Sequence, residues 1–234
     1  MPSKQKTLLF FAGFVSSLGS FAIICTCLGT QEWVFSKVQF SSTPTSTGNY
    51  SGIASVELGL FKGGYQKDIT EGVGLGTPWT SADVFDVLNS TTIKVSHIIV
   101  IFFLVAALIS CFLGLATTCL NSVSNPYLTF LGPLGVYVWS SINGILVLLA
   151  MIVYAINIEV NKLPRELVKA MDMGSDEFSS SQNTYGYSYW LLLLSIFLSM
   201  CTIGVIYYYQ HIRYSQQKQQ ERPMESASKD VILF

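Results

Sequence analysis

The chain has 234 residues, of which half are hydrophobic and 12% are charged, compared with about 25% charged residues in ordinary soluble domains. This composition and the mean hydropathy of +0.48 exclude an ordinary soluble domain and place the chain among integral membrane proteins. The net charge of −1 says little by itself, because the distribution of charge along the chain carries the information.

Four uncharged runs are long enough to cross a lipid bilayer as helices. An α-helix rises about 1.5 Å per residue, so about 20 apolar residues cross a hydrocarbon core about 30 Å thick. We expect transmembrane helices at 7–28, 95–120, 131–156 and 189–209, because none of these runs contains Asp, Glu, Lys or Arg. The first run follows a short basic segment, 1–6, as the core of a signal peptide would. Its length and its poor cleavage site favour an uncleaved helix.

The first hydrophilic segment, 29–94, is predicted to form a small sheet and one short helix. Residues 31–40 and 53–61 alternate between apolar and polar side chains, as half-buried strands do. A loop rich in Ser, Thr, Gly and Pro separates them, and turns are expected at the glycines that follow. Residues 78–88 are predicted to form a helix with Ser81 as its N-cap.

The remaining segments are a connector, a second loop and a tail. The connector 121–130 is long enough for an antiparallel helix pair and little else. Within the loop 157–188, residues 162–173 are expected to extend the third spanning helix, and residues 174–183 to be polar and flexible. The tail 210–234 has little capacity to form a core and is predicted to be disordered. The predicted fold class is an all-α membrane protein, a four-transmembrane-helix bundle with a small extracellular β-sheet.

The distribution of basic residues predicts that both termini are cytoplasmic. Segments 1–6, 121–130 and 210–234 hold six Lys and Arg residues in about 40 positions, whereas the two hydrophilic loops hold seven in about 100. The higher density favours the cytoplasmic side for the short segments under the positive-inside rule. The loops 29–94 and 157–188 are then extracellular.

Two N-glycosylation acceptor patterns agree with this orientation. Asn49-Tyr50-Ser51 and Asn89-Ser90-Thr91 both lie in the first hydrophilic loop, and the chain contains no other match. Asn49 and Asn89 are therefore the predicted glycosylation sites.

The spanning runs carry small residues instead of charges. The absence of charge argues against a transporter, a proton relay or a voltage sensor. Small residues at helical spacing let helix backbones approach closely in lipid. The predicted helix-packing residues are Gly13, Ser16, Ser20, Ser110, Gly114, Ser140, Gly144, Ser195 and Ser199. We favour packing within the bundle, and a dimerisation face is the alternative.

Aromatic residues and histidines lie near the predicted membrane borders. Trp33, Trp190 and the tyrosines 207–209 are expected to anchor the chain at the interface. His97 and His211 lie near opposite borders without metal-ligand partners, so we expect them to be interfacial polar residues. The sequence suggests no catalytic constellation, and we expect neither an enzyme nor a cofactor.

Three further features have a functional and a plainer interpretation. Cys119 is a candidate for S-palmitoylation near the cytoplasmic border, although we favour a buried small side chain. Ile232 and Phe234 are spaced as a PDZ ligand requires, although we favour an ordinary tail. The five cysteines all lie in apolar runs, so neither a disulfide framework nor a metal site is expected.

A set of short motifs carries a resemblance to a known family. The motifs are Met1-Pro2-Ser3, Leu28-Gly29-Thr30 before Trp33, Gly59-Leu60-Phe61, Asn125-Pro126-Tyr127 and Gly132-Pro133-Leu134-Gly135-Val136-Tyr137. Together they resemble the clarins over essentially the full chain. The entry to the fourth run, at residues 185–190, and the last three residues most resemble one member of that family.

The clarin resemblance implies a four-span glycoprotein with the layout of claudin-like tetraspans, a left-handed helix bundle and a small extracellular sheet. Claudin-like outer loops carry a Cys pair after a Gly-Leu-Trp element. Here Phe61 stands in place of the Trp and the loop has no Cys. The sheet must therefore hold together without a disulfide, and the resemblance does not extend to claudin-type strand polymerisation.

The resemblance also links the chain to sensory hair cells and the perception of sound. The function we expect is that of a non-enzymatic organiser or adaptor in the plasma membrane, acting through lateral and extracellular contacts. Its expected partners are membrane lipids and other membrane proteins, with a PDZ protein as a further candidate and no nucleic acid. The alternative is an auxiliary subunit that modulates an ion channel.

Overall fold

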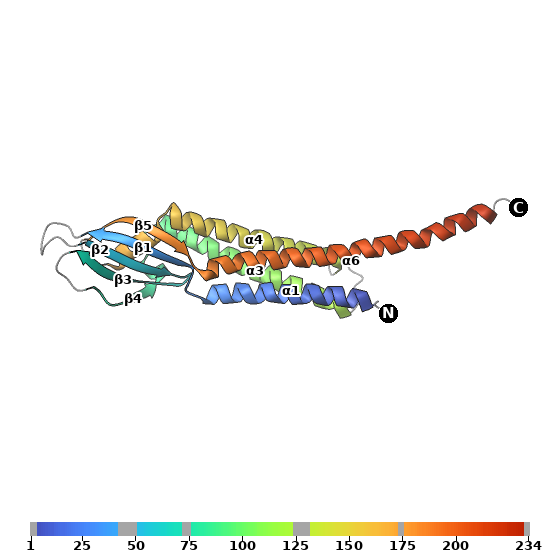
Figure 1. Ribbon diagram of the computed structural model, residues 1–234, viewed down its shortest axis with the longest axis horizontal. Helices are drawn as coiled ribbons and strands as arrows, with labels where there is room; N and C mark the ends of the chain where they lie inside the picture. Colours follow the sequence, from blue (N-terminus) through green and yellow to red (C-terminus); the bar gives the residue numbers. More distant parts are fainter. Residues whose placement is uncertain (1–3, 42–50, 72–75, 124–131, 173–175, 232–234) are drawn as a thin grey trace.

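The computed structural model describes residues 4–41, 51–71, 76–123, 132–172 and 176–231. The molecule is elongated: a helix bundle carries a curved β-sheet at one end, and its last helix projects from the other end (Figure 1). These two ends are called the sheet end and the tail end below.

Among the described residues, four helices are long and apolar enough to cross a membrane. They are α1 (Lys4–Gly29), α3 (Thr91–Val123), α4 (Pro133–Glu159) and α6 (Tyr187–Val231), and each overlaps one of the uncharged runs. They form a ring in which α1 and α4 each pack against both α3 and α6. The chain is therefore a multi-pass membrane protein, and the predicted fold class, four helices with a small sheet, is confirmed.

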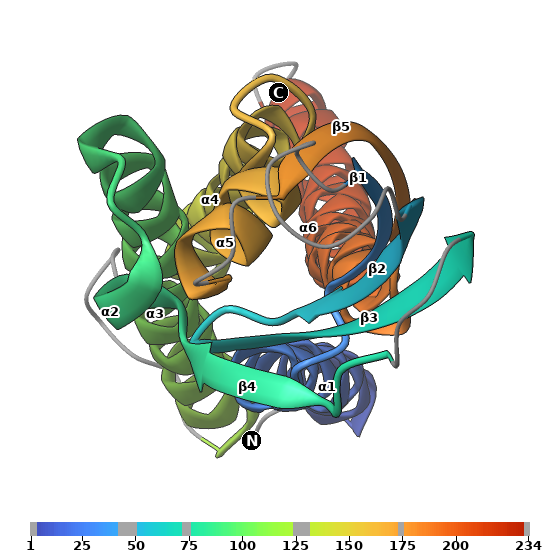
Figure 2. The ribbon, with the colours of Figure 1, turned by 90° about the vertical axis from the view of Figure 1, so that its left-hand side faces the viewer.

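The sheet end is an antiparallel sheet in the described part of the chain, curved over the end of the bundle (Figure 2). Its strands are β1 (Val34–Ser41), β2 (Ser51–Leu58), β3 (Lys62–Glu71), β4 (Thr80–Asp83) and β5 (Glu177–Tyr185). The strand order is β4-β3-β2-β1-β5, and Ser36 of β1 lies opposite Asn183 of β5. The two hydrophilic segments therefore build one sheet together.

Alternating apolar residues explain why the first two strands form. Val34, Val38 and Phe40 of β1 are buried, as are Ala54 and Val56 of β2, because successive side chains of a strand point to opposite faces. This inner face joins a core that continues into the helix bundle.

Trp33 connects the sheet to the bundle. The sequence predicted an interfacial anchor, but Trp33 is fully buried, and its ring centroid lies 5.0 Å from that of Tyr154 on α4. Its Nε1–H donates to the carbonyl oxygen of Cys27 at 2.9 Å, which satisfies the indole donor away from water. Trp33 is thus a core residue.

The predicted helix at 78–88 is wrong over its first half. Residues 80–83 form strand β4, which pairs with residues 62–65 of β3, and only Val84–Val87 form the short helix α2. The helix-like spacing of Val84 and Leu88 did place both in the core. Ser81 lies in the strand, and Asp83 occupies the N-cap position.

Residues 162–173 do not extend the third spanning helix. Helix α4 ends at Glu159, and a separate helix α5 (Leu163–Met171) begins after Lys162, whose φ of 51° is left-handed. Pro164 explains the break, because a proline inside a helix lacks the N–H and clashes with the carbonyl four residues earlier. The new direction brings buried Leu167 of α5 against the sheet.

Three other segments are more ordered than predicted. Residues 177–185 are strand β5, which begins inside the segment 174–183 that was expected to be flexible and ends just after it. Gly63 and Gly64 lie inside β3 and not in a turn, because Leu167 and Trp79 pack where their Cβ atoms would be. Helix α6 continues to Val231, so the tail up to that residue is helical. An existing helix propagates easily through Gln, Lys, Glu and Met.

Candidate functional site

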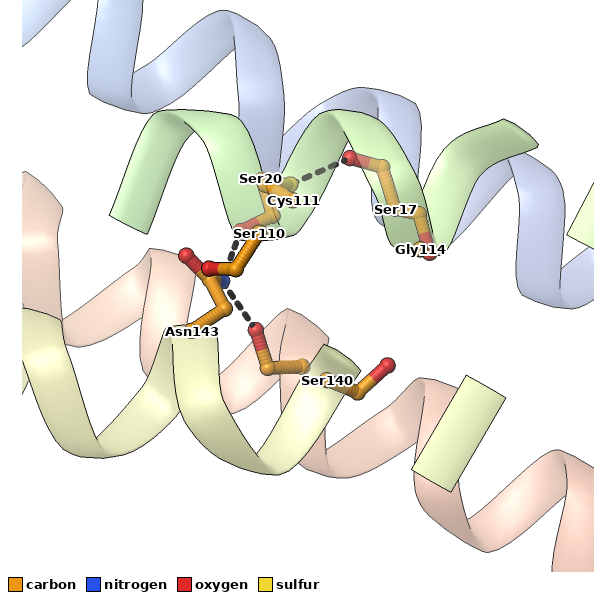
Figure 3. Close-up of a pocket in the computed structure, with 8 residues that line it drawn as sticks. Ser17, Ser20, Ser110, Cys111, Gly114, Ser140 and Asn143 are labelled. Atoms are coloured by element: carbon orange, nitrogen blue, oxygen red, sulfur yellow. Dashed lines mark hydrogen bonds between the residues drawn. The ribbon is translucent and has the colours of Figure 1, made fainter. Parts of the chain in front are cut away.

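Polar side chains from all four spanning helices meet inside the bundle (Figure 3). They line a small cavity of about 10 Å³, which is about the room that one water molecule needs. The lining residues are Ser17, Ser20, Ser110, Cys111, Gly114, Ser140, Asn143 and Ser199. None of them is acidic or basic, so the cluster can hold helices in register but offers no charged group for ion transfer.

Asn143 is the centre of this polar cluster. Its Nδ2 donates to Ser199 Oγ on α6 at 2.8 Å and to Ser20 Oγ on α1 at 3.2 Å. Ser199 Oγ donates its own hydrogen to the carbonyl of Ser195, so it can only accept from the amide. Ser20 and Ser195 share a further hydroxyl contact at 2.7 Å. One α4 side chain thus connects α4 with α6 and, across the ring, with α1.

Asn143 was not among the residues singled out from the sequence. It is the one side-chain amide within the four uncharged runs, and this is the signal that could have found it. Polar side chains inside a membrane bundle usually hydrogen-bond across helices.

The other predicted packing residues differ in what they contact. Ser16 donates to the carbonyl of Leu198 at 2.8 Å, and the Cβ position of Gly13 lies 3.8 Å from Thr202, both across the α1–α6 contact. The Cβ position of Gly114 lies 3.5 Å from the Cβ atom of Trp139, across the α3–α4 contact. Gly144, in contrast, has no described atom within 4 Å of its Cβ position.

His97 lies at the junction of the bundle and the sheet. It is completely buried, so the expectation of an interfacial histidine is wrong. Its Nε2 lies 2.6 Å from the carbonyl oxygen of Leu60 and must donate, because a carbonyl can only accept. The ring also packs edge-on against Phe85, with centroids 5.5 Å apart. His97 thereby fixes the Gly59-Leu60-Phe61 element to the start of α3.

A buried lysine connects the two hydrophilic segments. Lys67 of β3 is 7% exposed. Its Nζ lies 2.8 Å from a carboxylate oxygen of Asp172, which follows α5, and 2.8 Å from one of Asp176, which precedes β5. The ammonium also lies over the rings of Phe40 and Phe178, 5.1 and 5.5 Å from their centroids. Burial works to lower the pKa of Lys67, but the two carboxylates outweigh it and raise that pKa above its ordinary value.

This ion cluster joins the segments where no disulfide does. All five cysteines are free; Cys27 and Cys111 are buried and contact the carbonyl oxygens of Ser188 and Ser17. Cys119 is exposed near the tail end of α3, which contradicts the buried interpretation favoured from the sequence. Its palmitoylation stays a prediction.

The outer face of the sheet carries an exposed aromatic groove. Phe61 and Trp79 are each 46% exposed, although both are large apolar side chains. Trp79 packs over Gly64, where a Cβ would overlap the indole ring, and a depression of about 180 Å³ lies between this ring, Glu57 and Lys62. We use the name aromatic groove for this depression together with the exposed Phe61, which precedes Lys62 in the chain. Exposed apolar side chains beside polar ones are typical of contact sites.

The remaining predicted sites fall at the two ends of the molecule. Asn89 is exposed between α2 and α3 at the sheet end, and His211 is exposed on α6. Asn49, Ile232 and Phe234 lie outside the described residues. Their glycosylation and PDZ binding stay predictions.

Comparison with known proteins relates the whole chain to one group of proteins. The family model described as Clarin-2-like matches residues 4–206. Clarin-3 from Homo sapiens and from Mus musculus are each 38% identical to the chain over 234 residues, which is all of both chains. Clarin-1 from Mus musculus is 28% identical over 209 residues, 85% of each chain.

Proposed function

The chain belongs to the clarin family, and from this premise we propose that it is a non-enzymatic organiser of membrane proteins. It acts through lateral contacts of its helices and through contacts of its sheet end. The aromatic groove is the observation that carries this proposal, because it presents two large apolar side chains on a sheet that is itself fixed to the bundle. A rigid platform lowers the entropy cost of binding a partner.

Three contacts support the rigidity of this platform. Trp33 packs into the bundle core, His97 bonds to Leu60 next to the exposed Phe61, and Lys67 connects the first hydrophilic segment to the second. The groove therefore keeps its orientation relative to the membrane. A partner that binds there is held at a defined height and angle above the bilayer.

The proposed setting is the plasma membrane, with the sheet end outside and both termini in the cytoplasm. Two sequence features support this orientation: the density of Lys and Arg on the short segments, and the acceptor patterns at Asn49 and Asn89. The clarin relationship supports a role in sensory hair cells and the perception of sound, as part of the same proposal.

The test is proximity labelling in a cell that expresses the full chain, with cross-linking of the captured neighbours. We expect the double variant Phe61→Ser/Trp79→Ser to lose its sheet-end neighbours by about tenfold, since buried aromatic anchors dominate interfaces. Tyr214→Ser is the matched control, because it removes an exposed aromatic side chain on α6 at the tail end. Identical neighbours for all three proteins, or recovery of monomer alone, would refute the proposal.

The same surfaces would serve an auxiliary subunit of an ion channel, so the two functions need separate readouts. Co-expression with each channel captured by labelling, followed by current recording, distinguishes them. A current altered by the wild-type chain and restored by the Phe61→Ser/Trp79→Ser variant would favour the channel role. Unaltered currents with intact capture would favour the organiser.

A further inference from the structure

The side-chain carbonyl of Asn143 has no hydrogen-bond partner in the part of the chain that the structure describes. Its Oδ1 atom is buried, and the whole residue is only 1% exposed, inside the spanning helix α4. The Nδ2 atom of the same amide, in contrast, donates to both Ser20 and Ser199. A buried acceptor without a donor is costly, so Oδ1 requires an explanation.

The neighbours of Asn143 determine how its amide is oriented. An amide turned by half a rotation would place Oδ1 where Nδ2 now lies, opposite the hydroxyl of Ser199. Ser199 donates its hydrogen to the carbonyl oxygen of Ser195 at 3.1 Å, so it has none left for Oδ1. The turned amide would therefore set two acceptors against each other. Oδ1 must find its donor elsewhere.

The cavity lined by Asn143 has the size and the lining that a water molecule requires. Its volume of about 10 Å³ is close to the least that holds one water, and most of its lining residues carry hydroxyl groups (Figure 3). Apolar cavities stay dry, whereas polar ones hold water that completes the hydrogen bonds of buried groups. None of the described lining residues is acidic, so a cation would be a buried charge without a partner.

Two serines of the cavity provide further hydrogen bonds for this water. Ser110 Oγ on α3 donates its hydrogen to the carbonyl oxygen of Ala107 at 2.9 Å, so toward the cavity it can only accept. Ser140 on α4 lines the same cavity with a hydroxyl that can donate. Together with Asn143 Oδ1, the cavity thus offers two acceptors and one donor. A buried water typically makes about three hydrogen bonds.

We propose that this cavity is a binding site for one structural water molecule. The water donates one hydrogen to Asn143 Oδ1 and the other to Ser110 Oγ, and it accepts the hydrogen of Ser140. Asn143 itself connects α4 with α1 and α6. The water adds α3, so one hydrogen-bond network inside the membrane includes all four spanning helices. Such a network holds the helices in register without a buried charge.

Water-edited solid-state NMR of the full chain in lipid bilayers tests this site. Magnetisation is transferred from water protons to isotope-labelled asparagine side chains, and Asn143 is the one asparagine within the four uncharged runs. We expect a clear transfer to Asn143 although it lies inside a spanning helix. A wild-type chain in which the exposed Asn89 receives magnetisation and Asn143 does not would overturn the proposal.

A matched pair of variants distinguishes the cavity from general penetration of water into the bundle. Ser140→Val removes the proposed donor and fills the cavity with methyl groups, while both direct bonds of Asn143 remain, so the transfer to Asn143 should be lost. Ser141→Val makes the same change at the next residue, which is exposed on α4, and should keep the transfer. Equal transfer in the two variants would contradict the site. If Ser140→Val fails to fold, the wild-type measurement still decides.

Thermal unfolding in two salts distinguishes water from a bound cation. Sodium chloride and choline chloride at equal concentration are the two probes, because choline is too large for a cavity of about 10 Å³. A water site predicts equal midpoints of unfolding in both salts. A midpoint raised by sodium chloride alone would show that a cation occupies the cavity and would overturn the proposal.

Discussion

Lys67 shows how one side chain can join two segments that are distant in the sequence. It comes from the first hydrophilic segment, and both of its carboxylate partners, Asp172 and Asp176, come from the second. A buried charge is tolerated only when it is paired, because transfer of a lone ion out of water is very costly. Asn143 has a similar role within the membrane, where its amide connects three helices.

Lys67→Met should destabilise the sheet end by roughly 3 kcal/mol, because it leaves two buried carboxylates without their cation. Thermal unfolding of the purified chain in detergent would measure the change. Lys62→Met is the matched control, since Lys62 is exposed on the same strand, and it should have little effect. Adding Asp172→Asn and Asp176→Asn to Lys67→Met should recover much of the loss; a further loss would argue against the ion cluster.

Stability should fall at alkaline pH because several groups at the sheet end, among them Tyr185 and Lys67, have a higher pKa in the folded chain than in the unfolded chain. Tyr185 donates a hydrogen bond to Glu159 at 3.3 Å, and burial together with that carboxylate raises its pKa to about 12. The pKa of Lys67 is also raised. In unfolded chains both groups titrate at about pH 10, so their contribution is complete below that pH. The contribution of Tyr185 is lost as the pH rises toward about 12.

Unfolding temperatures measured on either side of pH about 10 would check this dependence. Tyr185→Phe should make the decline of stability with pH less steep, because it removes one of the titrating groups. A midpoint that stays constant up to pH about 11 would contradict the raised pKa values of Tyr185 and Lys67.

At the scale of the elements, close backbone contacts determine where strands and helices meet. Gly186 stands between β5 and α6, and its N–H donates to the carbonyl of Trp33 at 2.8 Å. A Cβ at this position would overlap the carbonyl oxygen of Glu32. The chain can therefore leave the sheet and enter the last spanning helix only with a glycine here.

Gly186→Ala should separate β1 from the start of α6 and destabilise the chain by about 2 kcal/mol, as overpacking typically does. Gly29→Ala is the control at the same end of the bundle, because no described atom beyond its own helix and chain neighbours lies within 4 Å of its Cβ position. Thermal unfolding of both variants would measure the difference. Equal midpoints for the two variants would show that the Glu32 backbone can move aside at little cost.

At the scale of the whole molecule, the sheet end is one body built from two loops. Both predicted acceptors, Asn49 and Asn89, belong to the loop that supplies four of its strands. If the sheet end is outside the cell, both acceptors enter the secretory lumen during synthesis. Glycosylation of Asn49 or Asn89 therefore reports on which side of the membrane the sheet end lies.

Asn49→Gln and Asn89→Gln should each remove one enzymatically cleavable glycan, seen as one step in gel mobility, and the double variant should show no shift after glycosidase. Asn161→Gln serves as the control, because Asn161 lies at the sheet end without an acceptor pattern. A wild-type chain without any glycan would count against the proposed orientation.

The sequence alone determined the bundle and two of the five strands that the structure describes, because these depend on contiguous residues. A bilayer requires about 20 uncharged residues in a row, and a half-buried strand requires alternation, as in 31–40 and 53–61. Local propensity predicted a helix at 78–88, but residues 80–83 form a strand because they pair with β3. It underestimated the tail helix, where propagation from α6 prevailed.

Only the tertiary structure decided which distant residues meet. Ser36 pairs with Asn183, Lys67 with Asp172, and Asn143 with Ser20, and the local sequence of these segments does not identify the partner. The same is true of burial at the membrane border, where His97 and Trp33 were expected to be interfacial and are core residues. Hydropathy depends only on the residues of one segment, so it indicates whether that segment is buried or spans a membrane. The neighbours of a given side chain depend on how whole helices and strands pack.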